Sequence, residues 1–330
     1  MHYRPLGTTG IRVSAVSFGA GPVPALLTRR DAGERQVAVL RRALDMGINW
    51  IDTAATYGDG QSEASLGTTL AALGSPDVHV ATKVRFTAEG LQDIRAFVRS
   101  SFESSLARLQ RPRGTLLQLH NSVTARRGDQ PTSITPEDVL GSGGVAEAFA
   151  ELRDEGRVLH LGITGLGDVP SLFEVVRSRA FETIQVPYHV LNPSAASTFV
   201  PAGAEANYGN IISECEKLGM GVLAIRVFAG GALAGQPPSA HTRTTKFFPL
   251  PIYERDQARA AALDQRMALE PGLAGMSLKE LALRFVLSHH GVSAALVGLS
   301  SLEQIDEAVE YASRGPLDPE VYVRLRSLIR

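Results

Sequence analysis

Eight short apolar runs alternate with eight amphipathic stretches, and this alternation constrains the fold of the chain more than any other feature. The runs expected to be strands are 15–18, 50–52, 78–83, 115–119, 158–163, 183–186, 221–225 and 294–297. The helical patterns lie near 33–46, 61–73, 91–109, 144–155, 168–178, 207–218, 277–289 and 301–313. Strands separated by helices pair in parallel through right-handed crossovers. The order therefore predicts an α/β fold.

The number of strands distinguishes a closed barrel from an open sheet. Eight strand–helix units favour a (β/α)8 TIM barrel over a doubly wound sheet. No strand-to-helix turn carries a Gly-x-Gly-x-x-Gly motif, and Gly19-Ala20-Gly21-Pro22-Val23-Pro24 does not match it. Residues 3–13 are typical of a β-hairpin, and further helical patterns lie near 256–269 and 318–328. We expect one barrel domain over 1–330, with an N-terminal β-hairpin and two extra helices.

Two long insertions interrupt the alternation, at 121–143 and 229–251. The second is rich in proline and glycine and contains Gln236-Pro237-Pro238 and Phe247-Phe248-Pro249-Leu250-Pro251. Connections of this length are usually functional or disordered. We expect both to be loops that shape the mouth of the active site.

Composition restricts the partners and the compartment. A formal net charge of −1 over 330 residues gives no electrostatic case for binding nucleic acid or a membrane. No stretch approaches the roughly 20 apolar residues that span a bilayer, and the N-terminus lacks a signal-peptide core. The single cysteine, Cys215, cannot form a disulfide within the chain. We expect a cytoplasmic monomer or small homo-oligomer that acts on a small molecule.

Polar residues end three consecutive predicted strands. Asp52 ends the second strand, Lys83 ends the third, and His120 follows the fourth, while Tyr57 stands on the loop after Asp52. Because the carboxyl ends of barrel strands share one rim, where active sites lie, these four side chains should meet. Each also has an ordinary interpretation, such as a turn cap for Asp52 or a core aromatic for Tyr57. Their joint placement favours a functional site.

A carboxylate, an ammonium, an imidazole and a phenol together suit proton transfer to a carbonyl oxygen. A free tyrosine has a pKa of about 10, and a neighbouring ammonium favours the phenolate. A carboxylate keeps the ammonium charged, and a neutral imidazole can orient a carbonyl group. Such a set can protonate an alkoxide as it forms, which carbonyl reduction requires.

At these positions the sequence resembles the aldo-keto reductase superfamily, specifically a bacterial branch, over essentially the whole chain. Tyr3–Ser14 is similar to the opening hairpin of the family, Trp50–Gly58 to its signature, and Leu119-His120-Asn121 to a further catalytic segment. The resemblance implies reduction of an aldehyde or ketone, or oxidation of an alcohol or sugar in reverse. It assigns Tyr57 as general acid, Lys83 as the group that tunes it, Asp52 as the partner of Lys83, and His120 as the group that orients the carbonyl.

The resemblance also implies a nicotinamide cofactor, NADP(H) more than NAD(H). Gln185 would hold the carboxamide, while Thr164-Gly165 replace the Ser-Asn common in the family. Ser300-Ser301, which also suit a helix cap, would bind the adenosine phosphate. The loop lacks the usual Lys or Arg and has Gln304 and Glu307 nearby, which weakens the preference for NADP. The expected cofactor contacts are Gly19, Ala20, Gly21, Asp52, Thr53, Thr164, Gly165, Gln185, Ile225, Arg226, Phe228, Gly230, Gly231, Gly298, Ser300, Ser301, Gln304 and Glu307.

Other activities remain as alternatives. A class I aldolase would use Lys83 as a Schiff-base nucleophile. A regulatory barrel would bind the cofactor without turnover. A glycosidase would need a second carboxylate, and Asp52 has no evident partner. No metal is expected, because zinc motifs are absent and His289-His290 are adjacent in the sequence, so they do not share one helix face.

Overall fold

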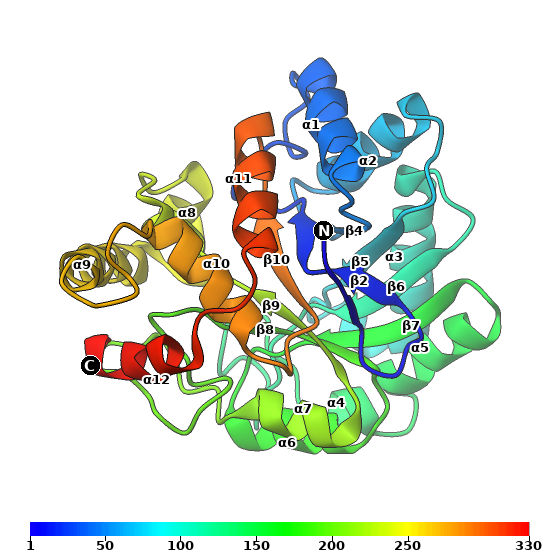
Figure 1. Cartoon of the computed structure of the whole chain (residues 1–330). Coiled ribbons are helices and arrows are strands. Elements are labelled where there is room, and N and C mark those ends of the chain that lie inside the picture. The colour runs from blue at the N-terminus through cyan, green and yellow to red at the C-terminus, as the bar shows by residue number, and fades with distance from the viewer. Residues whose placement is uncertain (330) are drawn as a thin grey trace.

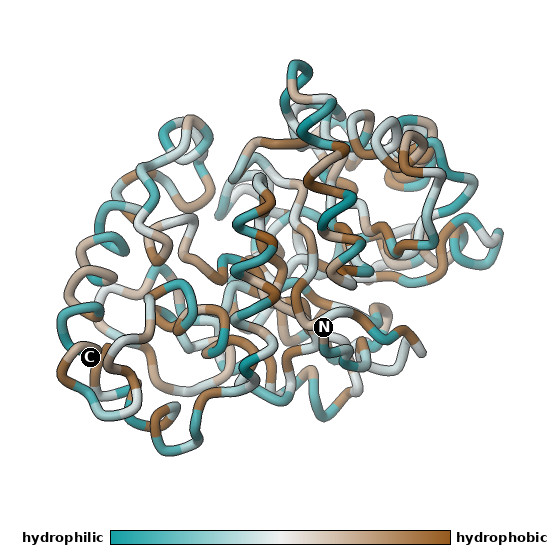
Figure 2. Tube along the Cα trace, turned by 45° about the horizontal axis from the view of Figure 1, so that its top comes forward, coloured by the Kyte–Doolittle hydropathy of each residue, from teal (hydrophilic) through white to brown (hydrophobic). Residues whose placement is uncertain are grey.

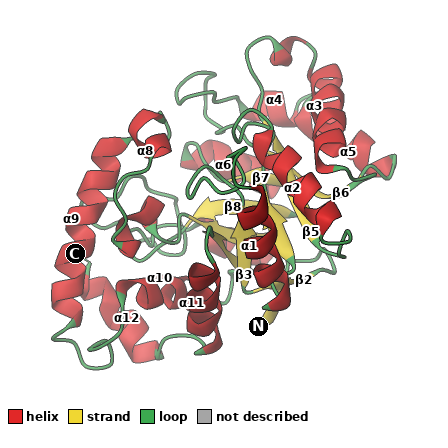
Figure 3. Cartoon of the chain, turned by 90° about the horizontal axis from the view of Figure 1, so that it is seen from above, coloured by secondary structure: helices red, strands yellow, loops and turns green. Residues whose placement is uncertain are grey.

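A computed structural model describes residues 1–329 and confirms the closed barrel (Figures 1 and 3). The parallel strands close in the order β10-β3-β4-β5-β6-β7-β8-β9. They are β3 Val16–Gly19, β4 Trp50–Asp52, β5 His79–Val84, β6 Gly114–Leu119, β7 Val158–Thr164, β8 Thr183–Pro187, β9 Gly221–Ile225 and β10 Ala294–Gly298. Each coincides with a predicted strand to within one residue at either end.

Helices surround the barrel, as Figure 3 shows from above. The helices of the repeating units are α1 Gly33–Asp45, α2 Gln61–Ala72, α3 Ile94–Leu109, α5 Val145–Asp154, α6 Val169–Arg177, α7 Ile211–Leu218, α10 Leu278–Ser288 and α11 Leu302–Ser313. In α1 the buried residues Gln36, Val39, Leu40 and Ala43 recur at helical spacing and form one face. Figure 2 shows the resulting alternation of hydrophilic and hydrophobic residues along the helices.

The N-terminal hairpin closes the lower end of the barrel, which is the end where the strands begin. Its strands are β1 Tyr3–Pro5 and β2 Arg12–Ser14, which pair antiparallel. Leu6 and Val13 of the hairpin pack in one buried cluster with Trp50, Leu116 and Leu223 of the barrel strands. The amide N–H of Thr8 also donates to the Gly219 carbonyl, 3.0 Å away, before β9 begins. A ligand therefore has to enter at the opposite end, where the strands finish.

The expectation of long loops is wrong in part, because both insertions contain short helices. The first holds α4 Pro136–Leu140, which begins with a capping box between Thr135 and Asp138. The second holds the 3-10 segment η2 Ala229–Ala234 and α8 Ala240–Thr244, which Ser239 caps. The extra helix expected to start near 256 is α9 Leu250–Met267, whose first turn accommodates a proline. The other extra helix is α12 Pro319–Leu328, and η1 Gly90–Gln92 precedes α3.

Two observations bear on expectations from composition. No helix within residues 1–329 is long and apolar enough to cross a bilayer. Cys215 is a buried free thiol, and burial raises its pKa to about 12. The thiol is therefore protonated and unreactive at neutral pH.

Candidate active site

The structure brings the four residues predicted for proton transfer together at the upper rim. Asp52 is the last residue of β4, Lys83 lies in the adjacent β5, and His120 directly follows β6. Lys83 Nζ forms a close ion pair with Asp52 and hydrogen-bonds the Tyr57 hydroxyl at 3.3 Å and the Thr53 carbonyl at 2.8 Å. The Lys83 and Asp52 side chains are only 1% and 2% exposed. The pair is therefore shielded from water.

Lys83 keeps its positive charge in this buried position. Burial by itself would lower the pKa of the ammonium, but the charge and hydrogen-bond interactions with Asp52 and Tyr57 together outweigh burial and raise that pKa. The ammonium also lies 4.8 Å from the centre of the Tyr57 ring. A permanent cation thus stands beside the phenol.

His120 is held as a neutral imidazole. Burial lowers its pKa well below the ordinary value, and the positive charges of Arg85 and Lys83 lower it further. Its Nδ1 lies 3.4 Å from the Thr56 hydroxyl, and its ring meets the Tyr57 ring edge-on with centroids 5.6 Å apart. The imidazole and the phenol therefore face the same space.

Two glutamine side chains fix the far side of the Asp52 carboxylate. Gln118 Nε2 donates to Oδ2 at 3.1 Å, and Gln185 Nε2 donates to the same oxygen. Gln185 was expected to hold the cofactor carboxamide, and the structure places it directly beside the ion pair. The sequence analysis missed Gln118, although a lone polar residue inside the apolar run of β6 is a recognisable signal.

The end of β7 offers a hydrogen-bonding group that fits a carboxamide. Thr164 Oγ1 is buried and has no hydrogen-bond partner within residues 1–329. The next residue, Gly165, donates its N–H to the Gln185 carbonyl at 2.6 Å. Since a buried hydroxyl rarely lacks a partner, Thr164 has the chemistry to bind a polar group of a ligand.

The predicted contacts near the N-terminal barrel strand also lie at this rim. Gly19 pairs with Asp52 across β3 and β4, and the Ala20 N–H donates to the Asp52 carbonyl at 2.8 Å. A Cβ on Gly21 would stand 3.6 Å from the Tyr57 ring. The Thr53 hydroxyl lies 2.8 Å from that of Ser62 on α2. Gly21 therefore lies beside Tyr57, Gly19 and Ala20 lie beside Asp52, and the Thr53 hydroxyl is held by α2.

The segment after β9, with Ile225 as its last strand residue, turns sharply and carries a buried charge cluster. Gly230 and Gly231 have φ angles of 71° and 109°, which only glycine adopts readily. Arg226, two residues before Phe228, lies 3.7 Å from Asp256 of α9. Burial lowers the pKa of the Arg226 guanidinium and raises that of the Asp256 carboxyl. The ion pair with Asp256 therefore gives Arg226 a partly structural role.

The segment after β10 is organised around the start of α11. Ser301 caps the helix by accepting from the Gln304 N–H at 3.3 Å, and Gln304 Oε1 accepts from the Ser300 N–H at 2.8 Å. Gly298 packs tightly, because a Cβ there would stand 2.2 Å from the Val23 carbonyl oxygen. The cap expected from the sequence is therefore present.

Cations that the sequence analysis missed lie next to this segment. Arg35 of α1 donates to the Ser300 carbonyl at 3.0 Å, and Lys279 of α10 pairs with Glu307 at 2.5 Å. A cleft of about 770 Å³ beside Ser300 is lined by Arg29, Arg30 and Arg35. These residues are far from 300 in the sequence, so spacing could not reveal them.

Consecutive phenylalanines of the 229–251 insertion contact opposite sides of the rim. The Phe247 ring lies 5.0 Å from the guanidinium carbon of Arg85, which follows β5. The Phe248 ring lies 3.8 Å from that of Arg226, which follows β9. In the closed order, β5 and β9 are four strands apart in either direction. The insertion therefore reaches across the upper end of the barrel.

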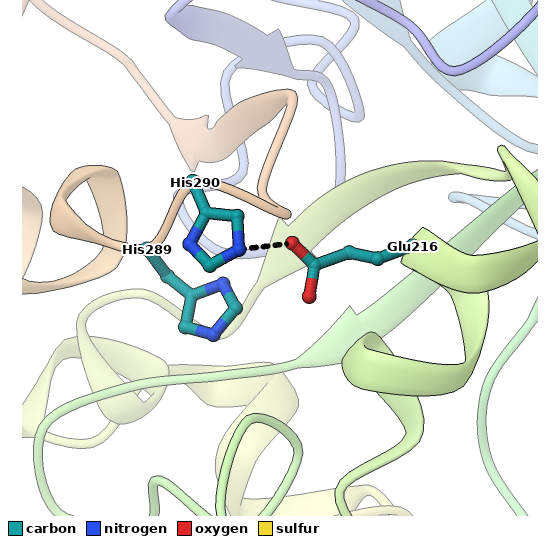
Figure 4. Close-up of side chains that lie close together, drawn as sticks. All are labelled: Glu216, His289 and His290. Carbon is teal, nitrogen blue, oxygen red and sulfur yellow. Dashed lines mark ion pairs between the residues drawn. The ribbon is translucent and has the colours of Figure 1, made fainter.

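A second cluster of titratable groups lies at the lower end (Figure 4). Glu216 of α7 pairs with His290 at 2.7 Å, and His289 stacks on His290 with ring centroids 4.9 Å apart. One potential ligand atom from each residue lies within 4.8 Å of the others. In a tetrahedral zinc site, ligand atoms stand about 3.4 Å apart. The ligand atoms are therefore spaced as in a surface ion pair between Glu216 and His290, with His289 stacked beside it.

Comparison with known proteins agrees with this geometry. The model of the Aldo/keto reductase family matches residues 19–330. The chain is 30% identical over 316 residues to L-galactose dehydrogenase of Arabidopsis thaliana, covering 93% of this chain and 86% of the plant protein. It is 26% identical to aldo-keto reductase YhdN of Bacillus subtilis, covering 94% and 88% of the two chains.

Solved structures share the fold. Aldo-keto reductase AKR11C1 from Bacillus halodurans, in its holo form, superimposes with a TM-score of 0.73 at 24% identity, covering 100% of this chain and 97% of its own. An aldo/keto reductase from Klebsiella pneumoniae, solved with NADP and acetate, gives 0.68 at 21% identity, with coverage of 100% and 96%. The chain belongs to the aldo/keto reductase family, whose members are oxidoreductases.

Proposed function

We propose that this protein reduces an aldehyde or ketone with NADPH, using Tyr57 as the proton donor. The observation that carries the proposal is the contact series in which Asp52 holds Lys83 and Lys83 holds the Tyr57 hydroxyl. The neutral His120 faces the same space. The similarity to L-galactose dehydrogenase supports sugars as one substrate class, with oxidation as the reverse reaction.

The four rim residues have separate roles in the proposed proton-transfer step. A nicotinamide cofactor, when bound at this rim, would supply the hydride for the carbonyl carbon. The Tyr57 O–H donates its proton to the carbonyl oxygen as negative charge develops there. The Lys83 ammonium stabilises the phenolate that remains, and Asp52 keeps that ammonium charged and in position. The neutral imidazole of His120 orients the carbonyl oxygen toward Tyr57.

We infer that Thr164, whose buried hydroxyl has no partner within residues 1–329, and Gln185 hold the carboxamide of the cofactor. The glycine turn at 230–231, which carries no side chains, lets a phosphate approach the backbone, and Ser300 and Ser301 suit the adenosine end. Arg35 beside Ser300 supplies a positive charge for a 2′-phosphate, which favours NADP(H) over NAD(H). The Klebsiella relative solved with NADP supports the same preference.

The 229–251 insertion is proposed to cover the bound cofactor and substrate. Its contacts with Arg85 and Arg226 span the rim, so the segment must open for ligands to enter. Closure would exclude water from the proton-transfer site.

A Schiff-base aldolase is less well supported. Its lysine must be unprotonated to attack a carbonyl, whereas Asp52 raises the pKa of Lys83. Treatment with borohydride in the presence of candidate substrates should leave no adduct on Lys83. A regulatory barrel without turnover would not require the complete set of four residues.

The proposal is tested by titrating NADPH and NADH separately and following the protein fluorescence. The tighter cofactor is then used to screen aldehydes, ketones and sugars by absorbance of the reduced nicotinamide. We expect tighter binding of NADPH and turnover with at least one carbonyl class. Binding without turnover across the screen would favour a regulatory role, and absence of binding would refute the proposal.

A further inference from the structure

Arg85 directly follows β5, which ends at Val84, and lies two residues beyond Lys83. Side chains two residues apart on extended backbone point the same way, so the alternation of β5, continued by one residue, directs Arg85 to the side of Lys83. The next residue, Phe86, is buried on the other side against Phe97. Asn121 clamps the Phe86 backbone, accepting from its N–H at 2.8 Å and donating to its carbonyl at 3.1 Å. The backbone that carries Arg85 is therefore fixed.

The Arg85 guanidinium has no counter-ion among residues 1–329. Within residues 1–329 it forms no hydrogen bond and no ion pair, and its Nε is buried without a partner. By contrast, Arg226 and Arg259 at the same end of the barrel both lie near Asp256. Removing a charged group from water without a partner costs free energy. A half-buried, unpaired guanidinium is thus unusual in this structure.

The ring of Phe247 covers the guanidinium without using its hydrogen-bonding capacity. The guanidinium carbon lies over the Phe247 ring, 5.0 Å from its centroid. Because the ring offers no oxygen or nitrogen acceptor, this contact leaves the guanidinium N–H groups available to an acceptor. A planar carboxylate fits such an edge with two parallel hydrogen bonds.

The position of Arg85 relates this free edge to the reacting groups. The guanidinium carbon lies 5.0 Å from the Phe247 ring of the insertion. Burial lowers the pKa of His120 and of His241 on α8, and the Arg85 charge lowers both further. The guanidinium therefore lies between the proton-transfer residues and the insertion that crosses the rim. A single small molecule could therefore place an anionic group at the guanidinium and a carbonyl group at the Tyr57 hydroxyl.

The geometry points to Arg85 as the residue that binds a carboxylate of the substrate, so that the enzyme acts on carbonyl compounds carrying a negative charge. This inference rests on the proposed carbonyl reduction and names its substrate class. Arg85 acts in binding and takes no part in hydride or proton transfer. Phe247 would position the guanidinium and cover the bound anion.

The test compares two substrates that differ in one charge, 4-carboxybenzaldehyde and methyl 4-formylbenzoate. Both are reduced with NADPH by the wild-type chain, Arg85→Met and Arg85→Lys. In Arg85→Met we expect kcat/KM for the carboxylate to fall about 10- to 100-fold, mainly through KM, while the ester changes by less than about two-fold. Arg85→Lys, which keeps the charge but not the fork, should recover part of the loss.

A binding measurement separates this role from catalysis. Calorimetric titration of the NADP-loaded protein with benzoate should show about ten-fold weaker binding to Arg85→Met than to wild type. Benzamide, which is neutral, should bind both alike. The matched control is Arg153→Met, an exposed arginine beside Asp154 in the last turn of α5, which should change neither substrate nor ligand.

Failures of the two proposals are distinguishable. If wild type reduces neither aldehyde and no other carbonyl, the proposed function fails. If wild type reduces both and Arg85→Met lowers both equally, or lowers neither, the carboxylate-binding role is overturned while the reductase stands. Equal binding of benzoate to wild type and Arg85→Met would overturn it independently.

Discussion

Lys83 is charged in a buried site because Asp52 stands against it. The two side chains are almost fully shielded, and two glutamines complete the hydrogen bonding of the carboxylate. Ion pairs in such places are seldom favourable for stability compared with apolar packing. This pair is better explained by what it does to the adjoining Tyr57 than by its contribution to folding.

Lys83→Met should lower both the stability and the turnover of the protein, and the two effects can be measured separately. It leaves Asp52 buried without a cation, so the free energy of unfolding in urea should fall by about 3–5 kcal/mol. It also removes the group that stabilises the phenolate, so kcat should fall by about 100-fold or more.

The matched control is the double variant Asp52→Asn/Lys83→Met, which removes both charges. It should recover much of the lost stability and none of the turnover. Recovery of turnover in the double variant would show that Lys83 serves the fold and not the chemistry.

His120 should make the stability of the protein sensitive to acid. Its folded-state pKa is lowered by burial, so below pH 6.5 the unfolded chain binds a proton that the folded chain does not. Stability is then lost as the pH falls. Between pH 7.5 and 5.5, wild type should lose about 1.4 kcal/mol more unfolding free energy than His120→Gln. Parallel pH profiles of the two proteins would contradict a neutral, buried His120.

At the scale of elements, the site depends on where strands end. β4 has only three residues, yet its pairing with β3 and β5 sets the position along the barrel axis at which Asp52 meets Lys83. The β6 strand brings His120 to the same level, because the His120 N–H donates to the Val84 carbonyl at 2.8 Å. The insertion 229–251 then crosses the rim through the contacts of Phe247 with Arg85 and of Phe248 with Arg226.

Phe248→Ala should loosen the insertion. Loss of the stacking on Arg226 removes a contact that is worth about 0.5–2 kcal/mol in such pairs. Hydrogen exchange in residues 236–249, followed by mass spectrometry, should accelerate by about 2- to 30-fold. Phe173→Ala, which removes a similar stack on Arg177 of α6, serves as the control and should leave this segment unchanged. Unaltered exchange in Phe248→Ala would mean that other contacts hold the insertion.

At the scale of the whole molecule, the sequence predicts the barrel well because buried parallel strands are continuous apolar runs. Such runs end where polar residues begin, so Asp52 and His120 indicated both the strand ends and the candidate site. The start of α9 was misplaced because prolines at 249 and 251 suggest a loop, although proline is tolerated in a first turn. The helices α4 and α8 were missed because each is only five residues long.

Contacts between distant segments could not be predicted from one sequence. The hydrogen bond between Arg35 and Ser300 joins residues 265 positions apart, and the one between Gln185 and Asp52 joins residues 133 apart. The lack of an ion-pair partner for Arg85 within residues 1–329 is likewise a property of the folded chain, because the neighbouring sequence does not show which cations are paired. The grouping of the four residues proposed for proton transfer could be predicted, because strand ends share a rim whatever their separation along the chain.

The central claim is that Tyr57 donates the proton during carbonyl reduction, and single-turnover kinetics of Tyr57→Phe tests it most directly. NADPH oxidation by a substrate found in the screen is followed by stopped flow, with the NADPH dissociation constant measured on the same protein. We predict that the single-turnover rate falls by about 100-fold or more, while the dissociation constant changes by less than about two-fold. A wild-type rate in Tyr57→Phe, with NADPH bound normally, would contradict the account.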